Sequence, residues 1–196
     1  MKANVDLRRR VLDASLALID SVGLEAFSMR EVARRAGVSH QAPYHYFADR
    51  EAIMAAIVAE GFAQLREELL AAGAGIGDPH QRLTALGKAY LAFAMSQPAH
   101  FKLMFRSEWV DAEKHAQAGA CAQDAFSVLS EVICTLTAGA PDEESRTLLL
   151  TAWSLAHGMA TLAIEGKLDK FVEPEIGVAR AASVAFERFE ALLRKP

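Results

Sequence analysis

The sequence is poor in cysteine, and its first residues do not resemble a targeting segment. Cys121 and Cys134 are the only two cysteines among 196 residues, too few for a disulfide framework. The opening MKANVDLRRR lacks the apolar core and the small-residue cleavage pattern of a signal peptide. These absences argue against a disulfide-rich secreted domain, and we expect a reduced, cytoplasmic protein.

Alternating apolar and polar residues, the pattern of a half-buried strand, are also missing, and the apolar period is helical throughout. One run, residues 147–164, has no charge over 18 residues. It contains Thr151, Ser154 and His157 and is short for a membrane span. We therefore interpret it as a helix buried among other helices, and we expect an all-α fold and no membrane partner.

Positive charge is scarce overall but unevenly placed. The net charge is −4, yet residues 1–50 carry eight Lys/Arg against six Asp/Glu, and residues 51–196 carry thirteen against nineteen. This balance argues against indiscriminate nucleic-acid binding by the whole chain. A mildly basic N-terminal part on an acidic body remains. Its Arg8-Arg9-Arg10 run fits either a DNA minor groove or a solvated helix face.

Helix punctuation is strongest in the first 50 residues. A helix over about 6–22 stops at Gly23, and Ser28 with Glu31 has the spacing of a capping box for the next helix. Gly37 suits the left-handed position after that helix. Ser39 then opens a third, very short helix with Pro43 near its first turn.

Between Ala36 and Glu51, the segment AGVSHQAPYHYFADRE gathers aromatic and histidine side chains. Two short helices joined by AGVS have the form of a helix-turn-helix. Asp49 is the expected N-cap of a long helix that extends to about Ala72. The third helix is too short for much beyond presenting its outer side, so the cluster is predicted to anchor it on one face and touch a partner on the other.

The stretch from Ser28 to Ala52, SMREVARRAGVSHQAPYHYFADREA, resembles the N-terminal signature of the Tet repressor (TetR) family of bacterial regulators. Pro43 stands where the family usually has Leu or Ile, and Arg50 stands in place of its common Lys. The resemblance implies nine helices, with a helix-turn-helix DNA-binding domain over residues 1–48. An effector-binding and dimerisation domain would occupy residues 49–196.

In that family the short helix enters the major groove, so the resemblance implies base contacts from His40, Gln41 and His45. Gln is suited to a bidentate contact with adenine, and His can donate to a guanine acceptor. Tyr44 and Arg50 match phosphate-contacting positions. The remaining three residues of the predicted set, Ser28, Arg30 and Ser39, would contact the DNA backbone.

The rest of the chain is read from helix starts and stops. One helix is expected from Pro79 to about Ser96, and a short one begins at Pro98. The next ends at about Leu136, and another follows the cap Asp142 and ends at Ile164. The last helix begins at Pro174 and continues to the end of the sequence. Gly139 and Pro141 separate two of them. The segment AWSLAHGMA, with Trp153, His157 and Gly158, resembles a C-terminal domain type named for its Trp-His-Gly motif.

Aromatic and sulfur side chains of this body either form its core or line an effector pocket. The candidates for ligand contact are Tyr90, Phe93, Phe101, Met104, Phe105, Phe126, Trp153 and His157. A pocket of this composition suits a small, largely apolar effector held by a few polar groups.

Two other classes compete with a regulator. Asp111 and His115, four apart on an expected helix, could share a metal in an enzyme, although such a pair is usually a solvated face. A helical adaptor that binds only protein would not need a capped helix-turn-helix. We therefore expect a homodimeric repressor, without cofactor, metal or catalytic residues, that a small effector releases from a near-palindromic operator.

Overall fold

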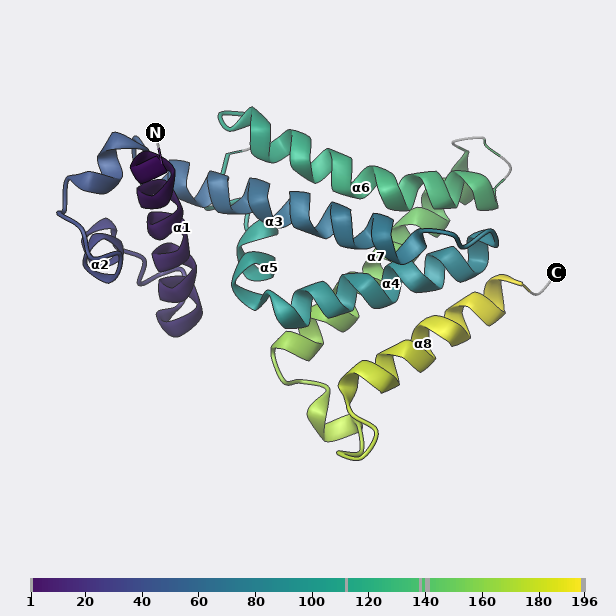
Figure 1. Cartoon of the computed structure of the whole chain (residues 1–196). Coiled ribbons are helices and arrows are strands. Elements are labelled where there is room, and N and C mark those ends of the chain that lie inside the picture. The colour runs from purple at the N-terminus through teal and green to yellow at the C-terminus, as the bar shows by residue number, and fades with distance from the viewer. Residues whose placement is uncertain (1, 112, 138, 140–141, 195–196) are drawn as a thin grey trace. The chain divides into compact units, whose positions relative to one another are not determined.

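The computed structural model describes residues 2–111, 113–137, 139 and 142–194, and every regular element in these ranges is helical. The described residues form eight α-helices and two 3-10 turns, and Figure 1 shows their order along the chain. Their bounds are α1 Lys2–Val22, α2 Met29–Arg35, η1 Ala42–His45, α3 Arg50–Gly73, α4 Pro79–Ser96, α5 Pro98–Met104, α6 Ala116–Leu136, α7 Glu143–Ile164, η2 Asp169–Phe171 and α8 Val178–Leu193. The predicted all-α class is confirmed, with the predicted nine helices close to this count.

The chain divides into two compact units. The first comprises Met1–Phe62 and Pro98–Ala122, and the second comprises Ala63–Gln97 and Gln123–Pro196. The division passes through α3 and α6, so each of these helices contributes residues to both units.

In the first unit, α1 packs against α2 and α5. Its apolar stripe is buried with side chains of α2 and α3, and the largest of these fully buried residues are Leu12, Leu18, Ile53, Met54, Ile57, Val11 and Val32. The expected stops are confirmed, because Gly23 and Gly37 have φ values of +83° and +66°. Residues with a Cβ atom rarely adopt this left-handed backbone conformation, whereas glycine adopts it readily.

The predicted capping box at α2 is wrong in its bonding. Ser28 is the N-cap residue, but its side chain makes no capping hydrogen bond. Glu31 instead accepts hydrogen bonds from Arg34 Nε at 2.8 Å and from Arg35 Nε at 3.1 Å. The Glu31 carboxylate, which a capping box needs at the start of the helix, is therefore hydrogen-bonded to two arginines one helical turn further on.

The third helix is also shorter than predicted. Regular structure begins at Ala42 rather than Ser39, and it is a single 3-10 turn that ends at His45. Pro43 lies inside this turn and has no N–H to donate, which disfavours a longer α-helix. The next expected start is confirmed, since the Ala52 N–H donates to Asp49 Oδ1 at 2.8 Å.

In the second unit, α4 packs against both α7 and α8 (Figure 1). The predicted caps of α4 and α7 are confirmed: Asp78 accepts from the His80 N–H at 2.9 Å and Asp142 from the Ser145 N–H at 2.8 Å. Gly87 of α4 lies against the Phe186 ring, where a Cβ atom would come within 2.9 Å of ring carbon Cδ1. This close approach brings α8 onto α4.

Few side chains of α7 are fully buried by the part of the chain that the structure describes. Among the described residues, α7 is the one helix long and apolar enough to cross a membrane, yet 17% of its most apolar window is buried. Its buried residues are small, such as Ala152, Ala156 and Ala160. The interpretation of this run as a helix packed among others holds for its small-residue face, which lies against α4, while much of its remaining surface is exposed in the single chain.

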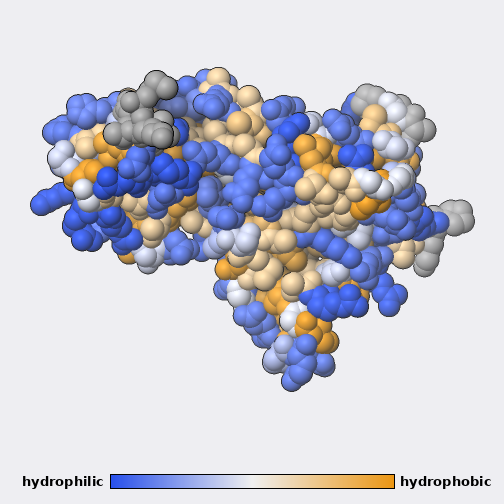
Figure 2. Space-filling model, viewed as in Figure 1, coloured by the Kyte–Doolittle hydropathy of each residue, from blue (hydrophilic) through white to orange (hydrophobic). Residues whose placement is uncertain are grey.

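Large apolar side chains remain exposed on α7, on α8 and between them. Leu150 is 56% exposed, Leu192 is 62% exposed, and Phe171 of the connecting turn is 77% exposed. Apolar atoms are visible at the lower tip of the molecule in Figure 2, where Figure 1 draws the connection between α7 and α8.

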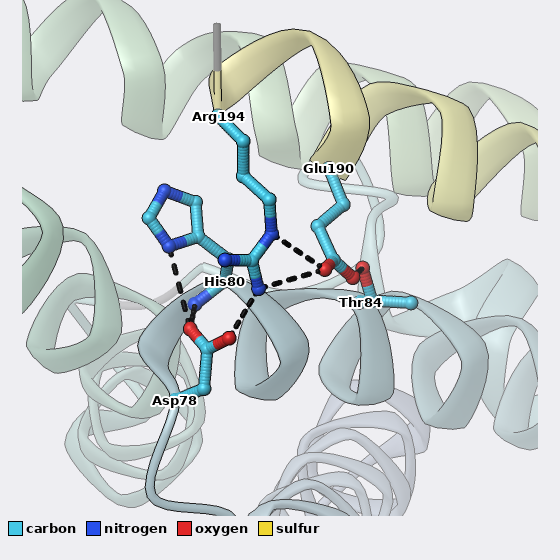
Figure 3. Close-up of polar contacts among 5 residues, drawn as sticks. All are labelled: Asp78, His80, Thr84, Glu190 and Arg194. Atoms are coloured by element: carbon cyan, nitrogen blue, oxygen red, sulfur yellow. Dashed lines mark hydrogen bonds and ion pairs between the residues drawn. The ribbon is translucent and has the colours of Figure 1, made fainter.

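A polar cluster joins the start of α4 to the end of α8 (Figure 3). Arg194 pairs with Asp78 and with Glu190, and Thr84 Oγ1 donates to Glu190 Oε2 at 2.6 Å. Together with Phe186, these contacts fix α8 along α4.

The start of α8 differs from the prediction. Pro174 lies in a turn, and the helix begins four residues later at Val178, after Gly177 with a φ of +72°. Pro141, the expected end of the α6 segment, lies outside the described residues.

Candidate DNA-contacting surface and aromatic clusters

The segment Ser39–His45 turns its polar side chains outward. Five of the predicted DNA-contacting residues in it are exposed: Ser39, His40, Gln41, Tyr44 and His45. Pro43 and Phe47 are buried and hold the turn against the first unit. The rings of His40 and Tyr44 lie 5.8 Å apart, so two of the exposed side chains support each other.

Backbone bonds shape the turn that precedes this segment. The Val38 N–H donates to Ala33 O at 3.0 Å across the left-handed Gly37. Arg10 donates from α1 to the carbonyl of Ala36, one of the acceptors left open at the end of α2. A residue of α1 therefore positions the helix-turn-helix.

The Arg8-Arg9-Arg10 run makes contacts within the protein, which neither alternative from the sequence anticipated. Arg8 lies over the Phe47 ring with its guanidinium carbon 5.5 Å from the ring centre. Arg9 donates to Asp13, and at 2.9 Å to Glu60 of α3. The three side chains thus join α1 to α2, α3 and the segment that follows η1.

At the start of α2, Ser28 and Arg30 are exposed. Hydrogen bonds from Arg34, and then from Arg35, lower the pKa of Glu31 to about 2. Because Glu31 takes these two arginines, Arg30 is the α2 arginine that presents its charge outside this cluster.

Arg50, the predicted phosphate contact at the start of α3, is exposed. Its guanidinium carbon lies 5.2 Å from the centre of the Trp109 ring. Glu51 accepts a 2.5 Å hydrogen bond from Lys114. Neither Trp109 nor Lys114 was predicted to act here, because nothing in their local pattern shows that their segment returns to α3.

Among the described residues, the expected helix carrying Asp111 and His115 is not formed, since residues 106–111 and 113–115 have turns or no regular structure. The His115 ring instead approaches Glu51, with 3.3 Å between Nε2 and Oε1 and no hydrogen bond. Among the described residues, no group of three or more metal-ligating side chains occurs. The geometry therefore offers no support for a metal shared by Asp111 and His115.

The predicted effector-contacting residues fall into two clusters, one in each unit. Tyr90, Phe93, Phe126, Trp153 and His157 belong to the second unit, and Phe101, Met104 and Phe105 belong to the first. Phe93 is fully buried.

The cluster of the second unit has a polar centre. Tyr90 Oη and His157 Nδ1 are 2.8 Å apart, and the Trp153 ring lies 6.1 Å from the His157 ring and 5.7 Å from that of Phe126. Burial raises the pKa of the Tyr90 hydroxyl and lowers that of His157. The centre is therefore a neutral phenol–imidazole pair among aromatic rings.

The cluster of the first unit is apolar. The Phe105 ring lies 5.6 Å from Phe62 and 5.1 Å from Phe101. Met104 lies so close to Gly61 that a Cβ there would be 2.7 Å from its sulfur. This contact brings α5 against α3.

Two family models match the chain. Residues 11–57 match "Bacterial regulatory proteins, tetR family" and residues 83–186, about half of the chain, match "Tetracyclin repressor-like, C-terminal domain". The second description does not distinguish the Trp-His-Gly type that the sequence suggested.

Individual relatives agree with these matches. The chain is 35% identical over 79 residues to the HTH-type transcriptional regulator BetI of Rhizobium meliloti, covering 40% of this chain and 39% of the relative. It is 33% identical over 115 residues to BetI of Escherichia coli, covering 49% and 59%. The chain therefore spans less than two thirds of these curated relatives.

A solved structure from Rhodococcus sp. RHA1, described as a protein with unknown function, is similar over nearly its whole length. It has 31% identity and a TM-score of 0.72, with 93% of this chain and 94% of that chain covered. From the helix-turn-helix geometry and the two family models, the chain belongs to the tetR family of bacterial regulatory proteins.

Proposed function

We propose that this protein is a cytoplasmic, sequence-specific DNA-binding regulator that represses transcription until a small, largely apolar effector releases it. The observation that carries the proposal is the exposed polar segment Ser39–His45, held on the buried Pro43 and Phe47. A surface of this kind needs a rigid support to place side chains in a groove. Family membership argues against the alternatives of an adaptor or a metal enzyme.

Residues 1–48 would supply the DNA contacts, and residues 49–196 would supply effector binding and dimerisation. This boundary separates roles rather than compact units, because α3 starts beside the DNA-contacting segment and continues into the second unit.

Base reading and phosphate binding give different signatures. We would first select a duplex for the wild-type protein from a random pool. Gln41→Ala should weaken binding to it by about 1–3 kcal/mol and relax the preference at one base position. Arg50→Ala should weaken all sequences alike and lower the slope of log affinity against log salt by about one. If Gln41→Ala changes neither affinity nor preference, the base-reading assignment is wrong.

A homodimer is supported by the exposed apolar side chains of α7 and α8, of which Leu150 and Leu192 are two. Isologous interfaces bury such faces against a second copy. The dimer should place two recognition segments about 34–36 Å apart, or one DNA turn, and should select a near-palindromic operator. Leu150→Glu should shift the protein towards monomer in sedimentation, and a wild-type monomer at micromolar concentration would refute the dimer.

Effector binding is proposed for the cluster around Tyr90 and His157 in the second unit, and the apolar cluster of the first unit is a separate candidate for ligand contact. A neutral hydrogen-bonding pair among aromatic rings suits a ligand that is apolar with few polar groups. Ala160→Trp and His157→Leu should each reduce displacement of DNA by a panel of apolar small molecules. Affinity for DNA without ligand should stay within a few fold. Loss of folding in His157→Leu, with no wild-type displacement by any molecule tested, would count against this site.

A further inference from the structure

The segment between α5 and α6 returns to the first turn of α3. Trp109 lies under the Arg50 guanidinium at 5.2 Å, and the neighbouring Val110 is buried, which anchors the segment. All of these residues belong to the first unit. The same segment thus touches the residue to which phosphate binding is assigned.

Glu51 provides a second connection to this segment. Its carboxylate accepts hydrogen bonds from Lys114 Nζ at 2.5 Å and from the Asp111 N–H at 3.3 Å. These bonds, with Lys114 first, lower the pKa of Glu51. Lys114 and Asp111 therefore hold the carboxylate of the residue that follows Arg50.

We propose that Trp109 is a positioning residue for DNA binding, which holds the Arg50 guanidinium ready to contact a phosphate. The proposal rests on the proposed function, since it requires that Arg50 contact DNA. A cation–π contact is an attraction to the face of the ring, and a guanidinium carries five N–H donors, so the contact leaves donors for a second partner. Phosphate is bound through such N–H donors, so the ring contact and phosphate binding can occur together.

The energetic gain comes from preorganisation. A free arginine side chain loses rotamer freedom when it binds, whereas an arginine already held on a ring loses less. A cation–π contact at an exposed site corresponds to about a twofold to fivefold effect on an equilibrium.

A double-mutant cycle on the selected duplex tests this proposal. Trp109→Ala should weaken binding about twofold to fivefold when Arg50 is present, and by less than 1.5-fold in an Arg50→Ala background. Trp109→Phe should retain most of the affinity, whereas Trp109→Met, which keeps bulk without a ring, should behave like Trp109→Ala. Gln117→Ala, at an exposed residue of α6 in the first unit, is the control and should leave affinity unchanged.

Salt dependence separates positioning from general destabilisation. Arg50→Ala should lower the salt slope by about one in the wild-type background, and Trp109 variants should not lower it further in the Arg50→Ala background. If Trp109→Ala weakens DNA binding by the same factor with Arg50 present and in the Arg50→Ala background, the positioning role is wrong and the proposed function stands. If Arg50→Ala itself changes neither affinity nor slope, the phosphate contact is wrong and the positioning role falls with it.

Discussion

At Gly87, α4 lies close to a buried ring of α8, and replacement of this glycine by alanine gives a quantitative test of the packing. A Cβ atom at this position would lie 2.9, 3.0 and 3.2 Å from three carbons of the Phe186 ring. Contacts under 3.0 Å force a neighbour to move, and this neighbour is a buried ring rather than a flexible chain end. We therefore expect Gly87→Ala to displace α8.

Two opposing effects set the magnitude. Alanine in place of glycine within a helix stabilises it by about 1 kcal/mol. Overpacking of a tight contact costs about 1–3 kcal/mol. Gly87→Ala should therefore lower the free energy of unfolding by about 0–2 kcal/mol.

The matched control is Gly158→Ala in α7, where a Cβ atom would meet nothing within 4 Å in the chain. It retains the helix preference and should stabilise by up to about 1 kcal/mol. The overpacking cost is the difference between the two variants, about 1–3 kcal/mol. Thermal unfolding at one protein concentration should separate their midpoints by about 2–4 °C for each kcal/mol.

A second substitution tests the cause. Phe186→Leu shortens the side chain that meets the new Cβ, so it should cost less in the Gly87→Ala background than alone. If Gly87→Ala stabilises the protein as much as Gly158→Ala, or if the two substitutions are additive, the close contact between α4 and α8 is not as described.

Three further predictions concern the first unit and the polar centre of the second. Arg10→Met removes the hydrogen bond to the Ala36 carbonyl. It should lower the free energy of unfolding by about 1 kcal/mol, measured by denaturation. It should also weaken DNA binding without changing the base preference, measured by selection from a random pool. The Glu31 carboxyl should titrate by NMR near pH 2, and Arg34→Ala should raise its midpoint, because the Arg34 bond is the largest cause of the shift. The stability linked to Glu31 is present above its unfolded pKa and is lost as pH falls towards 2. Burial lowers the pKa of His157, so this residue binds a proton more readily in the unfolded chain than in the folded one. The free energy of unfolding should therefore fall as the pH drops below about 6.5, the unfolded value. In a series of unfolding midpoints measured against pH, His157→Leu should remove this component.

The boundaries and turns of the fold were determined largely by local sequence. Asp49, Asp78 and Asp142 each accept the expected N-terminal hydrogen bond, and Gly37 has the expected left-handed conformation. These features depend on residues two or three apart in the chain, where side chain and backbone meet through short-range geometry. For the same reason the helix-turn-helix, with its exposed Gln41, could be identified before any tertiary contact was known.

Tertiary structure decided which partners the charged and aromatic side chains take. Arg10 binds a carbonyl 26 residues away and Glu51 pairs with Lys114, 63 residues away, so neither contact leaves a periodic signal in the sequence. Arg50 and Trp109 meet for the same reason, because the path of the chain after α5 brings them together. Local spacing thus specified the starts of α3, α4 and α7 and the turn at Gly37, whereas the surroundings of Arg50 depended on a chain return that only packing determines.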